Sequence, residues 1–251
     1  REFGRFRSHP GDTILVVALN GLLMPAAWFL LPRSWFFTVT GPSGYALALA
    51  GWMYSDVTAT NVLAADAELA IPLLDDPPAL RTVLSAKETA LWLLVAPLCV
   101  VAAAVCGVVE DDWVYTTFVI VSVAVIPIGA LAITGIVGVL FPYHQRSLRW
   151  RWDQRHRFHP VILRWSVLTV IPYAVYPLAA TLIMVIPFGI WWLLGNLDRS
   201  HRVPTWGFAV CVLIAAGIAV VVRWWAHRFT VRWIGQHIDS LRGFLCDPSR
   251  G

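Results

Sequence analysis

Charge is what this sequence has least of. Only 14% of its 251 residues are charged, whereas soluble domains carry about 25% charged residues. A soluble fold of this length would need a larger polar surface than these side chains can supply. Hydrophobic residues make up 58% of the chain, and 14 residues are tryptophan. The shortage of charge therefore excludes a soluble globular domain and predicts an integral membrane protein.

Lysine is almost absent, and this limits the chemistry. The single lysine is Lys87, and the residues before it, RTVLSA, contain no glycine. A phosphate-binding loop needs a glycine-rich turn before its lysine, so we expect no ATPase site in this chain. The motifs G-x-S-x-G and H-E-x-x-H and the Cys/His metal spacings are also missing. We predict no enzymatic activity, no catalytic residue, no metal site and no cofactor in this chain.

Cysteine is rare, and its spacing argues against disulfides. The four cysteines are Cys99, Cys106, Cys211 and Cys246, and no two form a C-x-x-C pair. Three of them lie in apolar runs, where free cysteine behaves as a small buried hydrophobe. We therefore predict no disulfide framework.

Long apolar runs are abundant. Six of them are long enough to cross the roughly 30 Å of bilayer hydrocarbon as helices. They are Thr13–Leu31, Ser43–Ala64, Thr89–Val109, Tyr115–Phe141, a fifth run that starts near Val161, and Thr205–Val222. The sequence thus predicts an all-α integral membrane protein with six transmembrane helices. These helices form a transmembrane domain over residues 13–222.

The fifth run is too long for one ordinary span. It reaches from Val161 to Leu194, which is about 50 Å if helical. Its prolines offer natural breaks. We predict a span followed by a short re-entrant or interfacial helix near Ile186–Leu194. The alternative is one long, kinked and tilted helix.

The basic residues predict the orientation in the membrane. With six spans, most of the 19 basic residues fall on the side that holds both termini. The positive-inside rule places that side in the cytoplasm. Residues 1–12 alternate Phe and Arg and predict an interfacial elbow helix, and residues 223–251 predict a cytoplasmic amphipathic tail. Because the chain begins with Arg1 instead of methionine, we expect it to come from a longer one.

The segment 65–88, between the second and third spans, is unusually polar. It reads DAELAIPLLDDPPALRTVLSAKE from Asp66 to Glu88. The DPPA sequence is typical of a helix start, because proline suits the first turn and acids favour the positive end of the helix dipole. Arg81 and Lys87 lie toward the other end of that helix. We predict a short amphipathic helix at the inner membrane face, placed to contact a cytoplasmic partner.

The second span ends in polar residues. Asp56 lies within YSDVTATN, with Tyr54, Thr60 and Asn61 close by. A carboxylate inside a membrane span is costly and is usually functional or paired. One interpretation is a packed cluster of interhelical hydrogen bonds. The other is the wall of a water-accessible substrate path.

The loop between the fourth and fifth spans combines arginine, tryptophan and histidine. His144, His156 and His159 lie there with Asp153, but the many arginines of residues 146–158 would repel a cation. We predict a solvated basic loop in preference to a metal site. Its position between two spans favours contact with anionic lipid headgroups or a cytoplasmic partner over nucleic acid.

Three stretches resemble the transmembrane subunits, or permeases, of type-2 ABC transporters. The loop before the third span resembles the corresponding loop of these permeases. In both, an Asn and an Asp are followed by Leu-Leu, Pro, Arg, Leu and Lys in that order. The matching residues are Asn61, Asp66, Leu73, Leu74, Pro77, Pro78, Arg81, Leu84 and Lys87. GVLFPY, which ends in Phe141, Pro142 and Tyr143, is similar to the exit of their fourth span, and REFGRFRSHP at the start is similar to their elbow helix.

This resemblance implies an ATP-driven exporter in the inner (plasma) membrane of a bacterial cell. Separate ATPase subunits would hold ATP and Mg²⁺, and a second transmembrane subunit, identical or related, would complete the assembly. The residues implied to contact the ATPase are Asp66, Leu73, Leu74, Pro77, Arg81, Leu84 and Lys87, with Phe3 and Arg7 of the elbow. Tyr54, Asp56, Thr60 and Asn61 would line the path of an amphipathic or hydrophobic substrate such as a lipid, glycolipid or drug-like compound.

Two other functions fit the same composition. A membrane-embedded enzyme acting on lipids would need clustered acids at one membrane face, and Asp66, Glu68, Asp75 and Asp76 are the candidates. A non-catalytic membrane scaffold would share the topology and be indifferent to ATP.

Overall fold

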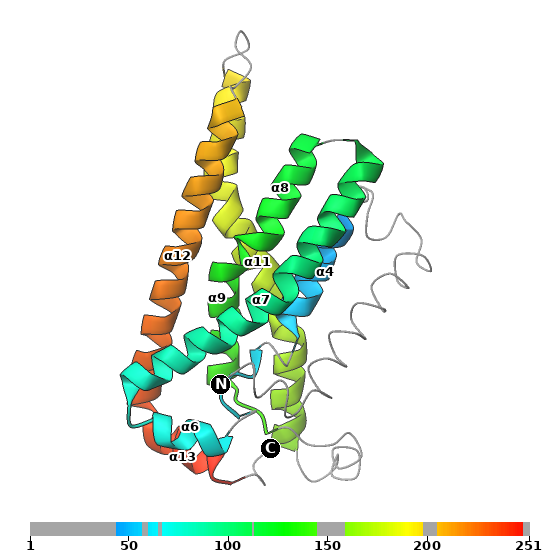
Figure 1. Ribbon diagram of the computed structural model, residues 1–251. Helices are drawn as coiled ribbons and strands as arrows, with labels where there is room; N and C mark the ends of the chain where they lie inside the picture. Colours follow the sequence, from blue (N-terminus) through cyan, green and yellow to red (C-terminus); the bar gives the residue numbers. More distant parts are fainter. Residues whose placement is uncertain are drawn as a thin grey trace.

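Regular structure in the described part of the chain is helical (Figure 1). The computed structural model describes residues 44–56, 60–64, 67–111, 113–144, 159–197 and 205–247. The helices are α4 (Gly44–Ser55), α6 (Ala67–Leu73), α7 (Pro77–Glu110), α8 (Trp113–Ala124), α9 (Pro127–Leu140), α11 (His159–Leu197), α12 (Thr205–Gln236) and α13 (Ile238–Leu245). The predicted all-α class is confirmed. The predicted elbow helix, first span and basic loop 146–158 lie outside the described residues.

Three of these helices, α7, α11 and α12, are long and apolar enough to cross a membrane. The pair α8 and α9 adds a fourth candidate if it is counted as one bent span. Helix α4 has 12 residues, fewer than the roughly 20 that a span requires. The helices are consistent with a multi-pass membrane protein, while the number of six spans stays a prediction.

Helix α7 begins where the sequence predicted and ends much later. Asp76 caps its first turn, because the carboxylate accepts a hydrogen bond from the N–H of Ala79 at 3.0 Å. The helix runs to Glu110, and the next residue, Asp111, terminates it by taking a left-handed conformation with φ of 55°. The predicted short helix before the third span is therefore wrong as a separate element. The residues SAKETA contain neither glycine nor proline, so nothing breaks the helix before Thr89.

The predicted break in the fifth run is also wrong. Helix α11 is continuous over 39 residues, about 58 Å at the usual helical rise. Pro172, Pro177 and Pro187 all lie inside it. Proline is tolerated in membrane helices because neighbouring groups satisfy the freed backbone carbonyls. The alternative of one long helix is what the structure contains, and Ile186–Leu194 belongs to it.

The predicted fourth span is a bent pair. Helix α8 ends at Ala124, α9 begins at Pro127, and their axes differ by 42°. Pro127 has no N–H to donate to the preceding turn, so the regular hydrogen-bond pattern stops there. Across this gap the N–H of Ile128 donates to the carbonyl of Val125 at 3.2 Å. This bond spans three residues instead of four, so it closes a tighter turn than that of an α-helix.

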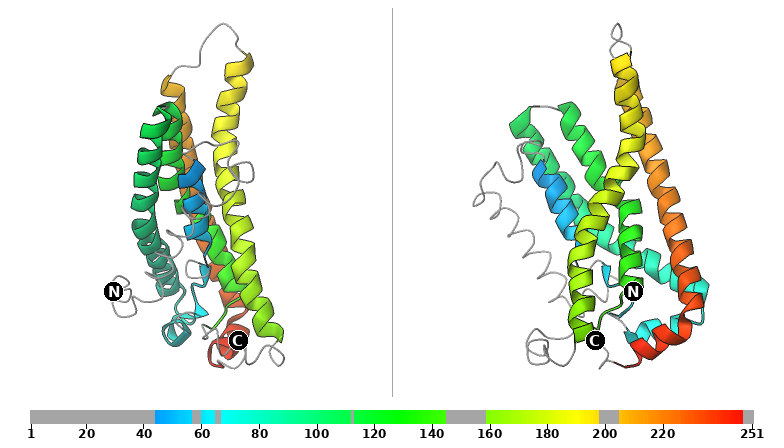
Figure 2. Two further views of the ribbon diagram at one scale, coloured as in Figure 1. Left: turned by 90° about the vertical axis from the view of Figure 1, so that its right-hand side faces the viewer. Right: turned by 180° about the vertical axis from the view of Figure 1, so that it is seen from behind.

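The long helices run side by side, and α6 and α13 lie at one end with the start of α7 (Figure 1). At the other end α11 and α12 reach beyond α7 and α8, as the two further views also show (Figure 2). A central core of buried apolar residues joins α4, α7, α8, α9 and α11. Helix α9 approaches α12 closely at Gly129. A Cβ on this glycine would lie only 2.7 Å from the carbonyl oxygen of Ala219, so the lack of a side chain permits the approach.

Candidate functional site

One end of the molecule is closed by a cluster of elements that we call the cap (Figure 2). The cap consists of α6, the first two turns of α7, the segment Pro142–His144, and α13. Its helices share a core of buried leucines and one phenylalanine, namely Leu74, Leu80, Leu84, Leu241, Phe244 and Leu245. Three of these lie at helical spacing on α13, so that helix buries one face and exposes the other.

Polar contacts join the cap elements across long stretches of sequence. Nη2 of Arg242 lies 2.6 Å from both carboxylate oxygens of Asp75, which links α13 to the α6–α7 connection. The ring nitrogen Nε2 of His144 lies 2.9 Å from the carbonyl oxygen of Phe244, and the two rings stack at 4.8 Å. His144 is buried, so the prediction that it belongs to a solvated loop is wrong. The cation of Arg164 lies 4.3 Å from the centre of the Phe244 ring.

The predicted ATPase-contact residues divide into two groups. Leu74 and Leu84 are buried, Leu73 is half-buried, and Nζ of Lys87 donates to the carbonyl of Val62 at 2.7 Å. These side chains hold the segment against the helices of this chain. Pro77 and Arg81 are exposed on the outer surface of the cap.

Other exposed side chains extend this outer surface. Leu69 on α6 is 59% exposed although it is a large apolar residue, and Pro72 and Pro78 are exposed nearby. Asp66, Phe3 and Arg7 lie outside the described residues.

The predicted substrate-path residues lie between α4 and the end of α9. The side-chain amide of Asn61 donates to the carbonyl of Tyr143 at 2.7 Å, and the Thr60 hydroxyl donates to the carbonyl of Asp56 at 3.2 Å. The Asn61 bond joins two distant segments, whereas the Thr60 bond is local, and the role of these residues in a substrate path stays a prediction. Tyr54 is fully buried, and its hydroxyl has no hydrogen-bond partner among the described residues.

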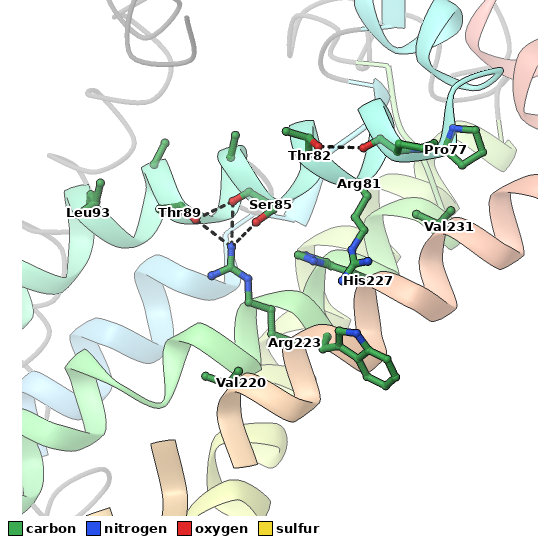
Figure 3. A pocket seen from close by; sticks show the side chains of 14 residues that line it. Pro77, Arg81, Thr82, Ser85, Thr89, Leu93, Val220, Arg223, His227 and Val231 are labelled. Carbon is green, nitrogen blue, oxygen red and sulfur yellow. Dashed lines mark hydrogen bonds between the residues drawn. The ribbon is translucent and has the colours of Figure 1, made fainter. Parts of the chain in front are cut away.

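A buried polar cluster joins α7 to α12, and sequence reasoning missed it. The Glu88 carboxylate lies 2.8 and 2.9 Å from Nε2 of His227, and both residues are buried. Nε of Arg223 lies 3.5 Å from the same carboxylate. Nη2 of Arg223 donates to the hydroxyls of Ser85 and Thr89 at 2.8 and 2.9 Å (Figure 3).

Helical spacing assembles this cluster. Ser85, Glu88 and Thr89 share one face of α7, and Arg223 and His227 are four residues apart on α12. The sequence contained two signals for this cluster. One is an acid at the start of the third predicted span, and the other is a pair of basic residues one helical turn apart at the end of the sixth. A buried carboxylate demands such partners, because an unpaired buried charge is costly.

Two of the four acids proposed for a lipid enzyme are engaged in contacts within this chain, whereas Glu68 is exposed and Asp66 lies outside the described residues. Asp75 pairs with Arg242, and Asp76 caps α7. Within the described residues, no group of three or more His, Cys, Asp or Glu side chains is arranged to hold a metal ion. The four cysteines are free, and Cys99 and Cys211 are buried, as predicted for cysteines in apolar runs, whereas Cys106 is only partly buried.

Comparison with known protein families, with curated proteins and with solved structures finds no match to this chain. The long apolar helices are consistent with a multi-pass helical membrane protein.

Proposed function

We propose that this chain is the transmembrane subunit of an ATP-binding-cassette exporter. It would pair with a second transmembrane subunit, identical or related, and with ATPase subunits that bind ATP and Mg²⁺. The observation that carries the proposal is the cap. Buried leucines fix its inner side to the helices, while Leu69, Pro77 and Arg81 are left exposed on its outer side.

Two of the stretches that resemble the permeases meet in space, which supports the proposal. Asn61 opens the first stretch, and Phe141–Tyr143 forms the second. The hydrogen bond from Asn61 to the Tyr143 carbonyl joins residues 82 positions apart. Because this bond joins the two stretches, each would help to hold the other in place beside the cap.

The continuity of α7 suggests how movement would reach the membrane. Because α7 is one helix from Pro77 to Glu110, a displacement of the cap shifts the whole helix. The Glu88–His227 contact then passes that shift to α12. Transport would follow from rocking of joined helices around a path near Tyr54 and Asp56, for an amphipathic or hydrophobic substrate.

The first test is purification of the full chain from its native bacterial membrane in mild detergent, followed by mass spectrometry. We expect a Walker-type ATPase in amounts equal to the chain. Leu69→Ser should reduce its recovery about tenfold, as loss of a central apolar contact of about 1.4 kcal/mol would. Leu213→Ser is the matched control, because Leu213 is 71% exposed on α12, away from the cap.

The outcomes separate the functions. Absence of an ATPase with the unaltered chain would overturn the exporter proposal and leave a lipid-modifying enzyme or a scaffold. Equal loss of the ATPase in both leucine variants would show that the cap surface is not the contact.

A further inference from the structure

A groove runs between α7 and α12 beside the buried Glu88 cluster (Figure 3). Its volume is about 1120 Å³. Its polar end is formed by the first turns of α7, with Arg81 and Thr82, and its apolar end by Leu93 and Val220. From Arg81 to Leu93 the groove follows α7 for about 18 Å.

The charge of the groove is one-sided. Its lining includes Arg81, Arg223 and His227, and none of its lining residues is acidic. Glu88 lies behind the wall, where His227 and Arg223 already satisfy its carboxylate. Arg228 adds a further cation beside the groove, 4.9 Å from the Trp224 ring centre. An anion in the groove would face an excess of positive charge.

Donor groups in the groove remain free. The contacts of Arg223 use Nε and Nη2, and its Nη1 has no partner among the described residues. Arg81 is exposed, and within the described ranges it makes no hydrogen bond or ion pair. Figure 3 shows Arg81 reaching from α7 toward α12, while Arg223 reaches from α12 to α7. Guanidinium groups placed in this way suit the oxygens of a phosphate.

A free phosphate would leave the apolar end of the groove unoccupied. Leu93, Val220 and Trp224 line the groove and are themselves exposed. Beyond them both helices present exposed apolar side chains, including Leu98 and Leu213. Tryptophan and arginine at one level, followed by aliphatic residues, is the pattern of a helix that enters a bilayer from its interface.

We propose that this groove binds one anionic glycerophospholipid from the bilayer. The phosphate would lie between Arg81 and Nη1 of Arg223, and an acyl chain would follow Leu93 and Val220 along α7 and α12. The bound lipid would bridge the two helices at the level where the Glu88 cluster already joins them. The inference rests on the groove and not on the proposed function, although Pro77 and Arg81 belong both to the groove and to the proposed ATPase-contact surface.

The test measures lipid binding to the detergent-purified full chain by native mass spectrometry. Phosphatidylglycerol and phosphatidylcholine with identical acyl chains are titrated separately. We expect one phosphatidylglycerol to bind about tenfold more tightly than phosphatidylcholine, a difference of about 1.4 kcal/mol. Arg81→Gln should reduce phosphatidylglycerol binding to the phosphatidylcholine level, and Arg81→Lys should retain part of it.

Arg232→Gln is the matched control, because Arg232 is exposed on α12 and does not line the groove. It should bind both lipids as the unaltered chain does. Equal binding of the two lipids to the unaltered chain, or unchanged binding to Arg81→Gln, would overturn the proposal. So would complete displacement of the lipid by excess inorganic phosphate, since that result would assign the site to a free anion.

Discussion

At the scale of single residues, Glu88 is the side chain whose environment demands most explanation. It is buried between three helices, because Gly135 of α9 lies against it as well as His227 and Arg223 of α12. A Cβ on Gly135 would lie 3.6 Å from the Glu88 carboxylate, an ordinary van der Waals distance, so α9 packs directly beside the acid. The carboxylate thus holds α7 and α12 together, with α9 packed beside the same cluster.

Removing the Glu88 carboxylate should destabilise the protein. Glu88→Leu leaves His227 and Arg223 without their acid, and such a loss costs about 3–5 kcal/mol when the partner is buried. Unfolding in mixed micelles, followed by circular dichroism, measures the change in free energy. Glu68→Leu is the control, since Glu68 is exposed on α6 and should change stability by less than about 0.5 kcal/mol. Equal stability of the two variants would contradict a structural role for the cluster.

At the scale of elements, the cap depends on the docking of α13. Its contacts with α6 and α7 combine the buried leucine core with the Arg242–Asp75 ion pair. Both members of that pair are substantially exposed, and exposed pairs contribute about 0–1 kcal/mol. The apolar core must therefore supply most of the docking energy.

Disrupting this core should release α6 from the cap. Leu241→Asp places a carboxylate among buried apolar side chains, which costs several kcal/mol without a partner. Hydrogen exchange measured by mass spectrometry should show protection of Ala67–Leu73 falling about a hundredfold, with α9 unchanged. Asp239→Asn on the exposed face of α13 should leave both helices protected. Unchanged exchange in α6 after Leu241→Asp would show that α13 does not hold it.

At the scale of the whole molecule, the two ends differ in chemistry. The cap end carries Arg81, Arg242 and the polar end of the groove. The opposite end is formed by the tips of α11 and α12 (Figure 1). By the positive-inside rule the cap end is expected in the cytoplasm.

This orientation is tested by labelling cysteines in intact cells with a membrane-impermeant maleimide. Cys246 is exposed beside α13, so it should react only after the cells are permeabilised. Trp206→Cys, in a chain that carries Cys246→Ser, should react without permeabilisation, because Trp206 is 69% exposed at the far tip of α12. Cys106 is replaced by alanine in both chains to remove its partial exposure. The reverse labelling pattern would contradict the predicted orientation. It would place the cap outside the cytoplasm, where it could not contact a cytoplasmic ATPase.

The sequence by itself determined the helical class, the apolar character of the long helices and the first residue of α7. These properties are local: hydrophobicity and the DPPA cap act within a few residues. The tertiary structure alone decided that α11 is continuous through its prolines, that His144 is buried, and that Glu88 meets His227 from 139 positions away. Proline and polar residues permit several outcomes locally, and only packing against neighbouring helices selects one, because those helices supply the partners for each buried polar group.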